Sequence, residues 1–167
     1  MVRIGQGFDI HRVVPDRPLM LGGVHIPCAF GLLGHSDADV LLHAITDALL
    51  GALALGDLGQ WFPNTDERYR GIASARLLEA VLRSPQAQGW TLVNLDTTIL
   101  AERPKLAPHV PAIRDSLATI FAADKGCISV KAATMEGVDS IGRGEAIAAQ
   151  AVLLIARDAP PLTPSSL

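Results

Sequence analysis

The chain has 167 residues, a length typical of one domain, and 49% of them are hydrophobic, which excludes an intrinsically disordered protein. A net charge of −3 and a pI near 5.9 argue against a general nucleic-acid binder. No run of about 18 uncharged apolar residues is present, and the N-terminal segment lacks the apolar core of a signal peptide. We therefore expect a cytoplasmic protein in which the isolated Cys28 and Cys127 are reduced thiols, with a single disulfide as the alternative.

Eight elements are predicted from the spacing of apolar residues and from turn residues. In chain order they are a strand over 2–11, a hairpin over 19–27, helices over 38–55 and 74–82, a strand over 90–102, a helix over 109–123, and strands over 127–135 and 145–156. The connections over 31–34 and 56–72 are expected to be loops. This order predicts an α+β two-layer sandwich, with a mixed four-stranded main sheet, helices on one face and a small hairpin. We expect one domain over 1–157 and a disordered tail over 158–167, which is rich in proline and serine.

Asp9 and His11 form the most informative pattern in the chain. They lie two residues apart on the first predicted strand, so their side chains project from the same face. His43, on the first predicted helix, can supply a second imidazole, which makes three of the four ligands of a tetrahedral Zn²⁺. An open fourth position is typical of a catalytic zinc. The alternative, equally compatible with the spacing alone, is a buried strand histidine bonded to a neighbouring carboxylate.

The helix around His43 carries further candidate residues. Asp39, His43 and Asp47 follow one another at i, i+4 spacing, so all three project from one side. Either aspartate could hold the second ring nitrogen of His43 and fix its tautomer, although Asp39 could equally be a first-turn carboxylate favoured by the helix dipole. His35 and Ser36 precede the helix, where backbone N–H groups bind anions, so both are candidates to contact a phosphate. The alternative for Ser36 is a simple helix cap.

Two later stretches combine glycines with charged side chains. The loop 56–72 is either a lid over a ligand or a surface loop that its aromatic side chains anchor to the core. Glu136 could bind a hard divalent cation, with the Thr134 hydroxyl beside it. Arg143, flanked by glycines, either clamps a phosphate or pairs with Glu145. None of these motifs is specific when taken alone.

Taken together, the motifs form a collinear series that runs from residue 2 to about residue 156. The segments are RIGQGFDIHR, GGVHIP, GHSDADVLLHAITDALLGA, LGDLGQWFPNTD, AERPKL, VKAATME and GRGE. This series resembles the 2-C-methyl-D-erythritol 2,4-cyclodiphosphate synthase family, the cyclases of non-mevalonate isoprenoid biosynthesis. Because seven segments match in order, a chance resemblance is implausible.

The resemblance implies a homotrimer with an active site at each subunit interface. The implied substrate is 4-diphosphocytidyl-2-C-methyl-D-erythritol 2-phosphate, whose 2-phosphate attacks the β-phosphorus of its own diphosphate and releases CMP. The family's zinc ligands match Asp9, His11 and His43. A second divalent ion, Mg²⁺ or Mn²⁺, would bind at Glu136.

The resemblance also implies roles for individual residues. Catalytic roles fall on His35, Thr134 and Glu136. Contacts with the substrate fall on Asp9, His11, His35, Ser36, Asp57, Leu58, Gly59, Phe62, Pro63, Asn64, Thr65, Asp66, Ala101, Lys105, Leu106, Ala107, Ala133, Thr134, Met135, Glu136 and Arg143. A cavity on the trimer axis, which in similar proteins can hold an isoprenoid diphosphate, falls on Phe8, Arg143 and Glu145.

The sequence departs from the family's usual pattern at several positions. Ala38 replaces a glycine, and because alanine is a good helix former we expect little effect at the start of the helix. Asn64 replaces an aspartate and removes a charge, and Ser140 removes an aromatic wall from the axial cavity. Further departures lie at Ala133, Met135, Asp139 and Ala146.

Two other functions are compatible with a zinc site. A zinc-dependent phosphoesterase would use the open metal position to activate water, and a non-catalytic trimeric protein would only bind a ligand. The lack of a further carboxylate or histidine cluster argues against the phosphoesterase. The intact zinc ligands and Glu136 argue against the binding protein.

Overall fold

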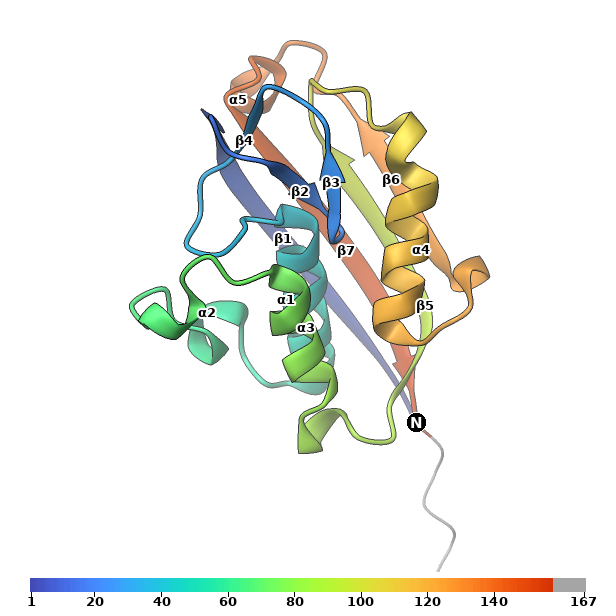
Figure 1. The fold of residues 1–167 in the computed structure, drawn as a ribbon. Coiled ribbons are helices and arrows are strands. Elements are labelled where there is room, and N and C mark those ends of the chain that lie inside the picture. The colour runs from blue at the N-terminus through green and yellow to red at the C-terminus, as the bar shows by residue number, and fades with distance from the viewer. Residues whose placement is uncertain (158–167) are drawn as a thin grey trace, which may run out of the picture.

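The computed structural model describes residues 1–157, so the tail expected over 158–167 lies outside the described residues. The strands are β1 (Val2–Pro15), β2 (Leu19–Leu21), β3 (Val24–Ile26), β4 (Phe30–Leu32), β5 (Thr91–Leu100), β6 (Ile128–Ala133) and β7 (Ala146–Ala156). The helices are α1 (Val40–Leu53), α2 (Leu58–Trp61), α3 (Ser74–Leu82), α4 (Val110–Phe121) and α5 (Asp139–Gly142), joined by short 3₁₀ turns. Figure 1 shows this α+β arrangement, and the β2–β3 hairpin is a separate two-stranded sheet on the same side of the main sheet as the helices. No helix in residues 1–157 is long and apolar enough to cross a membrane.

The main sheet has five strands in the order β4-β1-β7-β5-β6, where four were predicted. β1 pairs with β7 and β7 with β5 in antiparallel fashion, and β5 runs parallel to β6. The additional strand, β4, begins at Phe30 and overlaps the segment 31–34 that was expected to be a loop. Its three residues are too few to show an alternating pattern. They pair because β1 continues beyond His11 to Pro15, which aligns Val13 with Leu32.

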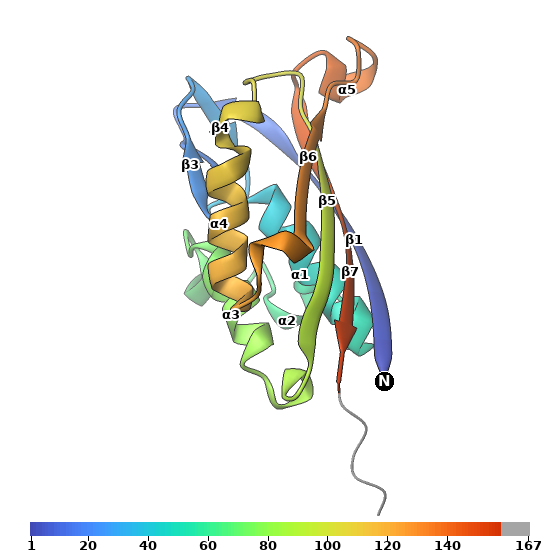
Figure 2. The same cartoon turned by 90° about the vertical axis from the view of Figure 1, so that its right-hand side faces the viewer.

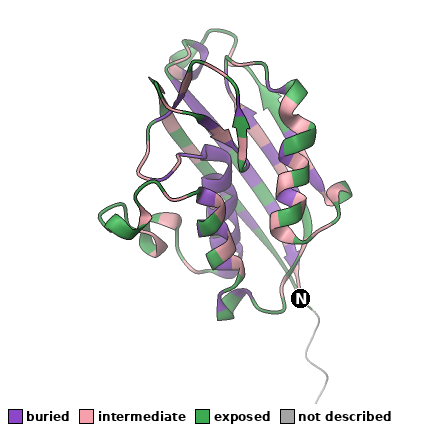
Figure 3. Cartoon of the chain, in the orientation of Figure 1, coloured by how far each residue is buried: buried purple, intermediate pink, exposed green. Residues whose placement is uncertain are grey.

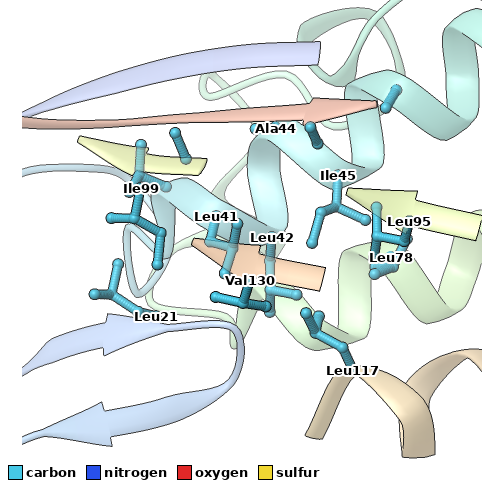
Figure 4. Close-up of a cluster of buried hydrophobic side chains, with 14 of the residues drawn as sticks. Leu21, Leu41, Leu42, Ala44, Ile45, Leu78, Leu95, Ile99, Leu117 and Val130 are labelled. Atoms are coloured by element: carbon cyan, nitrogen blue, oxygen red, sulfur yellow. The ribbon is translucent and has the colours of Figure 1, made fainter. Parts of the chain in front are cut away.

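The helices α1, α3 and α4 cover one face of the sheet, as predicted (Figure 2). Helix α1 lies at the centre, and all its residues except Asp47 and Gly51 are buried, which Figure 3 shows as a continuous buried helix. Glycine allows this close packing: a Cβ at Gly7 would lie 2.0 Å from the Ala44 carbonyl oxygen, so any larger residue would push α1 away from β1. Leucine, isoleucine and valine side chains from the sheet, the helices and the hairpin fill the space around α1 (Figure 4).

The opposite face of the sheet has no helix over it within the described chain (Figure 2). Alternate residues of β1 project there. They include the apolar Ile4, which is 69% exposed, Phe8 (48%) and Ile10 (45%), and also the polar Gln6 and Arg12; Val152 of β7, 41% exposed, pairs with Gln6. Soluble monomers rarely leave several large apolar side chains this exposed on one face. We refer to Ile4, Phe8, Ile10 and Val152 as the bare face.

The structure departs from a regular pattern at two positions. A register shift between Leu92 and Asn94 interrupts the alternation of β5 and leaves Val93 44% exposed. Ala38 was expected to begin the helix, yet α1 begins at Val40, and Ala38 precedes it with a φ of 60°. Glycine is the favoured residue in that left-handed conformation, so the alanine at position 38 is strained there.

Candidate metal centre and cleft

The three predicted zinc ligands come together at one point between β1 and α1. Asp9 Oδ2 lies 2.9 Å from His11 Nε2 and 2.9 Å from His43 Nδ1, and the two ring nitrogens are 3.0 Å apart. Asp9 and His11 share a face of β1, while Ile10 between them projects to the bare face. The close approach of β1 to α1 brings His43 against this pair. These three residues are the only group of potential metal ligands of this size found in residues 1–157.

The second nitrogen of each imidazole is held by the protein, which leaves the first nitrogen directed into the cluster. His11 Nδ1 donates to the carbonyl oxygen of Leu33 at 2.7 Å, so Nε2 presents its lone pair. His43 Nε2 lies 2.9 Å from the Ser74 hydroxyl and 3.1 Å from the Ser36 hydroxyl. Three acceptor atoms therefore face one another, and only a proton or a metal cation among them makes this arrangement stable. Two imidazoles and one carboxylate are a ligand set that suits Zn²⁺.

The electrostatics of the cluster also favour a cation. Burial by itself would raise the pKa of Asp9, but the hydrogen bonds with His11 and His43 outweigh it and lower that pKa well below its ordinary range. Burial by itself would lower the pKa of His11, and the hydrogen bond with Asp9 outweighs it and raises that pKa. The carboxylate is thus held as an anion that needs a positive partner.

Neither Asp39 nor Asp47 holds the second ring nitrogen of His43, and for Asp39 the alternative of a carboxylate at the start of the helix is confirmed. Asp39 is fully buried and caps α1, accepting hydrogen bonds from the backbone N–H of Leu42, Gly22 and Gly23. Burial raises its pKa, despite these three bonds. Asp47 accepts from the backbone N–H of Leu58 at 2.7 Å. The i, i+4 spacing was correct, but Asp39 faces the hairpin turn instead of His43.

The partner of His43 is instead Ser74, the first residue of α3, which the sequence did not single out. Its hydroxyl donates to Asp37 Oδ1 at 2.5 Å, and Asp37 Oδ1 also accepts from the backbone N–H of Ser74 at 3.1 Å. Ser74 is 0% exposed. A serine at the start of a predicted helix is normally a capping residue, so no local pattern distinguished it.

A cleft of about 690 Å³ opens beside the metal centre, within the usual size range of ligand pockets. Most predicted substrate contacts from the first half of the chain line it together with the zinc ligands. Those lining residues are His35, Ser36, Asp57, Leu58, Gly59, Phe62, Pro63, Asn64 and Thr65. Gly34, Asp47, Tyr69 and Leu77 also line the cleft and were not predicted to do so. These four residues come from the segment before α1, from α1, from the loop 56–72 and from α3, and local sequence patterns do not predict that such distant segments meet.

The loop 56–72 forms one wall of this cleft and is not structureless. It contains α2 and a 3₁₀ turn at Glu67–Tyr69, and the Trp61 indole N–H donates to the carbonyl oxygen of Leu55 at 3.0 Å. Asp66 differs from its predicted neighbours because its carboxylate pairs with Arg68 at 2.6 Å, outside the residues that line the cleft. Its carbonyl oxygen lies 3.2 Å from His35 Nε2.

The remaining predicted residues form a second group, at the ends of β5 and β6. Because these strands are parallel, their ends meet at the same edge of the sheet, where the Ala101 N–H donates to the Ala133 carbonyl oxygen at 3.0 Å. The Thr134 hydroxyl donates to Glu136 at 2.9 Å. This group also includes Lys105, Leu106, Ala107 and Met135. In residues 1–157 of a single chain, none of this group lines the cleft.

Arg143 and Glu145, which follow this second group, form an exposed ion pair with an Nε–Oε1 distance of 2.8 Å. The hydrogen bonds between them raise the pKa of Arg143 and lower that of Glu145. Pairing was one of the two alternatives that the sequence left open for Arg143. In the described chain neither side chain contacts the metal centre.

The fold and the site together define an α+β protein with three potential metal ligands, Asp9, His11 and His43, at the wall of a ligand-sized cleft. The profile of the YgbB family matches residues 2–156. A 2-C-methyl-D-erythritol 2,4-cyclodiphosphate synthase from Geobacter sulfurreducens is 56% identical over 154 residues, which cover 92% of this chain and 98% of that protein. The chain belongs to the YgbB family.

Solved structures agree with this assignment. A structure of 2C-methyl-D-erythritol-2,4-cyclodiphosphate synthase is 42% identical, with a TM-score of 0.85, over 92% of this chain and 100% of that one. Another structure of a synthase with this name, described as a CDP-bound form, is 41% identical, with a TM-score of 0.84 and the same coverage of both chains.

Proposed function

We propose that this protein is a metal-dependent lyase of non-mevalonate isoprenoid biosynthesis. It converts 4-diphosphocytidyl-2-C-methyl-D-erythritol 2-phosphate into 2-C-methyl-D-erythritol 2,4-cyclodiphosphate and releases CMP. The observation that carries this proposal is the convergence of Asp9, His11 and His43 within 3.0 Å, in the wall of the cleft lined by the matching segments. Relatives that are more than half identical over nearly their whole length have the same name.

The ligand set fits Zn²⁺, which would bind to Asp9 Oδ2, His11 Nε2 and His43 Nδ1. When bound, this ion supplies Lewis-acid polarisation of a phosphate oxygen. The protein's own residues orient the substrate: Ser36 and His35 lie on one side of the cleft, and Asn64 and Thr65 lie in the loop that forms another wall.

The reaction joins two phosphates of one molecule, so orientation of the substrate is the protein's main contribution. An oxygen of the 2-phosphate forms a bond to the β-phosphorus, while the bond from that phosphorus to the α-phosphate oxygen breaks and CMP leaves with the electron pair. The attacking phosphate is already anionic, so no general base is required. The loop 56–72 forms one wall of the cleft. This position supports a role for the loop in excluding water from the reacting phosphates.

We further propose a homotrimer in which one chain's cleft is completed by its neighbour. The bare face supports this assembly, because its exposed apolar side chains would be removed from water at a subunit interface. The second group of residues, from Ala101 to Ala107 and from Ala133 to Glu136, would then supply the cytidine pocket to the adjacent subunit. Glu136 would hold a second divalent cation, Mg²⁺ or Mn²⁺, with Thr134 beside it.

An axial cavity of this trimer would present Phe8, Arg143 and Glu145, and it could hold an isoprenoid diphosphate. Phe8 is 48% exposed on the bare face, which supports a position at a subunit contact. Arg143 would meet the diphosphate. The cytoplasmic location expected from the sequence also belongs to this proposal.

The proposal is tested by incubating the purified full chain with the diphosphocytidyl substrate, Zn²⁺ and Mg²⁺. We expect CMP and a cyclic diphosphate in equal amounts, measured by phosphorus NMR. Release of inorganic phosphate would instead identify a phosphoesterase, and the absence of turnover would identify a binding protein. A variant with Asp9→Ala serves as the control that separates metal-dependent turnover from contaminating activity.

A further inference from the structure

We propose that Ser74, held in place by Asp37, is a positioning residue that fixes the orientation and tautomer of His43 in the metal centre. The inference rests on the metal-binding role proposed above. Ser74 Oγ lies 2.9 Å from His43 Nε2 and 2.5 Å from Asp37 Oδ1, and both the serine and the histidine side chain are buried. The three residues come from different parts of the fold: α1, the start of α3 and the loop before α1.

The two hydrogen bonds that link Asp37, Ser74 and His43 can be donated in only one direction. A carboxylate oxygen accepts and cannot donate, so the Ser74 hydroxyl must give its proton to Asp37. The oxygen of Ser74 is then free only to accept, which requires the proton of His43 to be on Nε2. The lone pair of His43 is therefore on Nδ1, the atom that faces Asp9 and His11. Asp37 thus selects the tautomer of a histidine that it does not touch.

The hydroxyl of Ser36 is compatible with donation from His43 to Ser74 and from Ser74 to Asp37. Ser36 Oγ accepts from the backbone N–H of Ala38 at 3.1 Å and lies 3.2 Å from Ser74 Oγ. Its own proton can be donated to the Ser74 oxygen, which has a second lone pair available. Every polar atom around His43 Nε2 is thereby satisfied without a proton on Nδ1.

The same contacts tie the metal centre to the loop that carries His35. The Asp37 N–H donates to the Ile72 carbonyl oxygen at 3.0 Å, and the Gly71 N–H donates to the His35 carbonyl oxygen at 2.8 Å. From the other side, Arg17 donates to the carbonyl oxygens of Gly34 and Ser36. Ser74 and Asp37 therefore connect His43 to the segment that carries His35. A displacement of His43 would also shift this wall of the cleft.

The test measures zinc affinity, by competition between the full chain and a chromophoric chelator. We expect Ser74→Ala to weaken zinc binding by about 10- to 100-fold, the effect usual for loss of a hydrogen-bond partner of a metal ligand. The Co²⁺ absorption spectrum should change with it, because the orientation of one imidazole is no longer fixed. Ser74→Thr retains the hydroxyl and should recover most of the affinity. Zinc affinity equal to that of the unaltered protein in Ser74→Ala would overturn the inference.

Ser84 provides a matched control just beyond the other end of α3. It is also buried, and in residues 1–157 its hydroxyl has no hydrogen-bond partner. Ser84→Ala should therefore leave zinc affinity unchanged, and an equal loss in both variants would show a general packing effect and overturn the inference. Because zinc binding needs no turnover, a failure of CMP release in the unaltered protein counts against the proposed function and not against this role of Ser74.

A measurement on the unaltered protein covers the case in which Ser74→Ala does not fold. Long-range ¹H–¹⁵N NMR of the metal-free chain identifies which nitrogen of each histidine carries a proton. We expect a proton on Nε2 of His43 and on Nδ1 of His11. A His43 ring protonated on Nδ1 would contradict the direction of the hydrogen bonds.

Discussion

The metal centre and the second group of residues differ in how far one chain completes them. At the metal centre, each ring nitrogen that faces away from the cluster already has a partner, and the three ligand atoms lie within 3.0 Å of one another. At the ends of β5 and β6, Glu136 and Lys105 lie outside the cleft, and Glu136 is exposed. Contacts within the chain therefore bring the three candidate metal ligands together, whereas no contact within residues 1–157 brings the second group to the cleft. The proposed homotrimer accounts for this difference.

The largest effect is expected at the metal centre. His43→Ala removes one of three ligands, so zinc binding should be lost and CMP release should fall by about 10²-fold or more. His25 is an exposed histidine in β3 outside the cleft, and His25→Ala is the matched control. Metal analysis and turnover measure the effect. Full zinc content in the His43 variant would show that the metal binds elsewhere.

The second prediction tests the metal centre and the second group of residues separately. Glu136→Gln should lower turnover by about 10²-fold, because it removes a ligand of the second cation, while zinc affinity stays unchanged. Mixing it with Asp9→Ala and allowing subunits to exchange should restore about a quarter of full activity, since one site in four combines two intact contributions. If the mixture has no more activity than the separate variants, then each site belongs to a single chain.

The third prediction concerns the bare face. Ile4→Asp places a charge on a residue that is 69% exposed in the single chain, so the fold should persist while trimers dissociate. Sedimentation should show monomers, turnover should be lost, and zinc affinity should be retained. Ala112→Asp adds the same charge to an exposed position of α4 and should leave the trimer intact. An Ile4→Asp variant that remains active as a monomer would refute an interfacial active site.

The smallest effect is expected at Ala38, beside the metal centre. Glycine there would relieve a left-handed conformation that costs alanine about 1 kcal/mol, but it would also remove a buried methyl group that contributes about 0.8 kcal/mol. Ala38→Gly should therefore change the free energy of unfolding by less than about 0.5 kcal/mol, measured by urea denaturation. A larger change in either direction would mean that one of these two contributions is wrongly assigned.

Local sequence patterns predicted the helices, strands and shared faces that follow from the spacing of residues. The collinear series of motifs predicted the residues of the candidate site. The spacing of Asp9 and His11 was sufficient to place both on one face of β1, and the spacing of apolar residues was sufficient to predict the helix α1. They did not predict contacts between distant segments. β4 is too short for a pattern, Val93 is displaced by a bulge, and the pairing of Ser74 with His43 joins residues 31 positions apart.

The central claim is that Asp9, His11 and His43 hold one zinc ion, and anomalous diffraction at the zinc edge tests it most directly. Crystals grown with Zn²⁺ should show one strong peak per chain, at about 2.0 to 2.2 Å from Asp9 Oδ2, His11 Nε2 and His43 Nδ1. A peak bound by other side chains, or no peak at this cluster, would contradict the account.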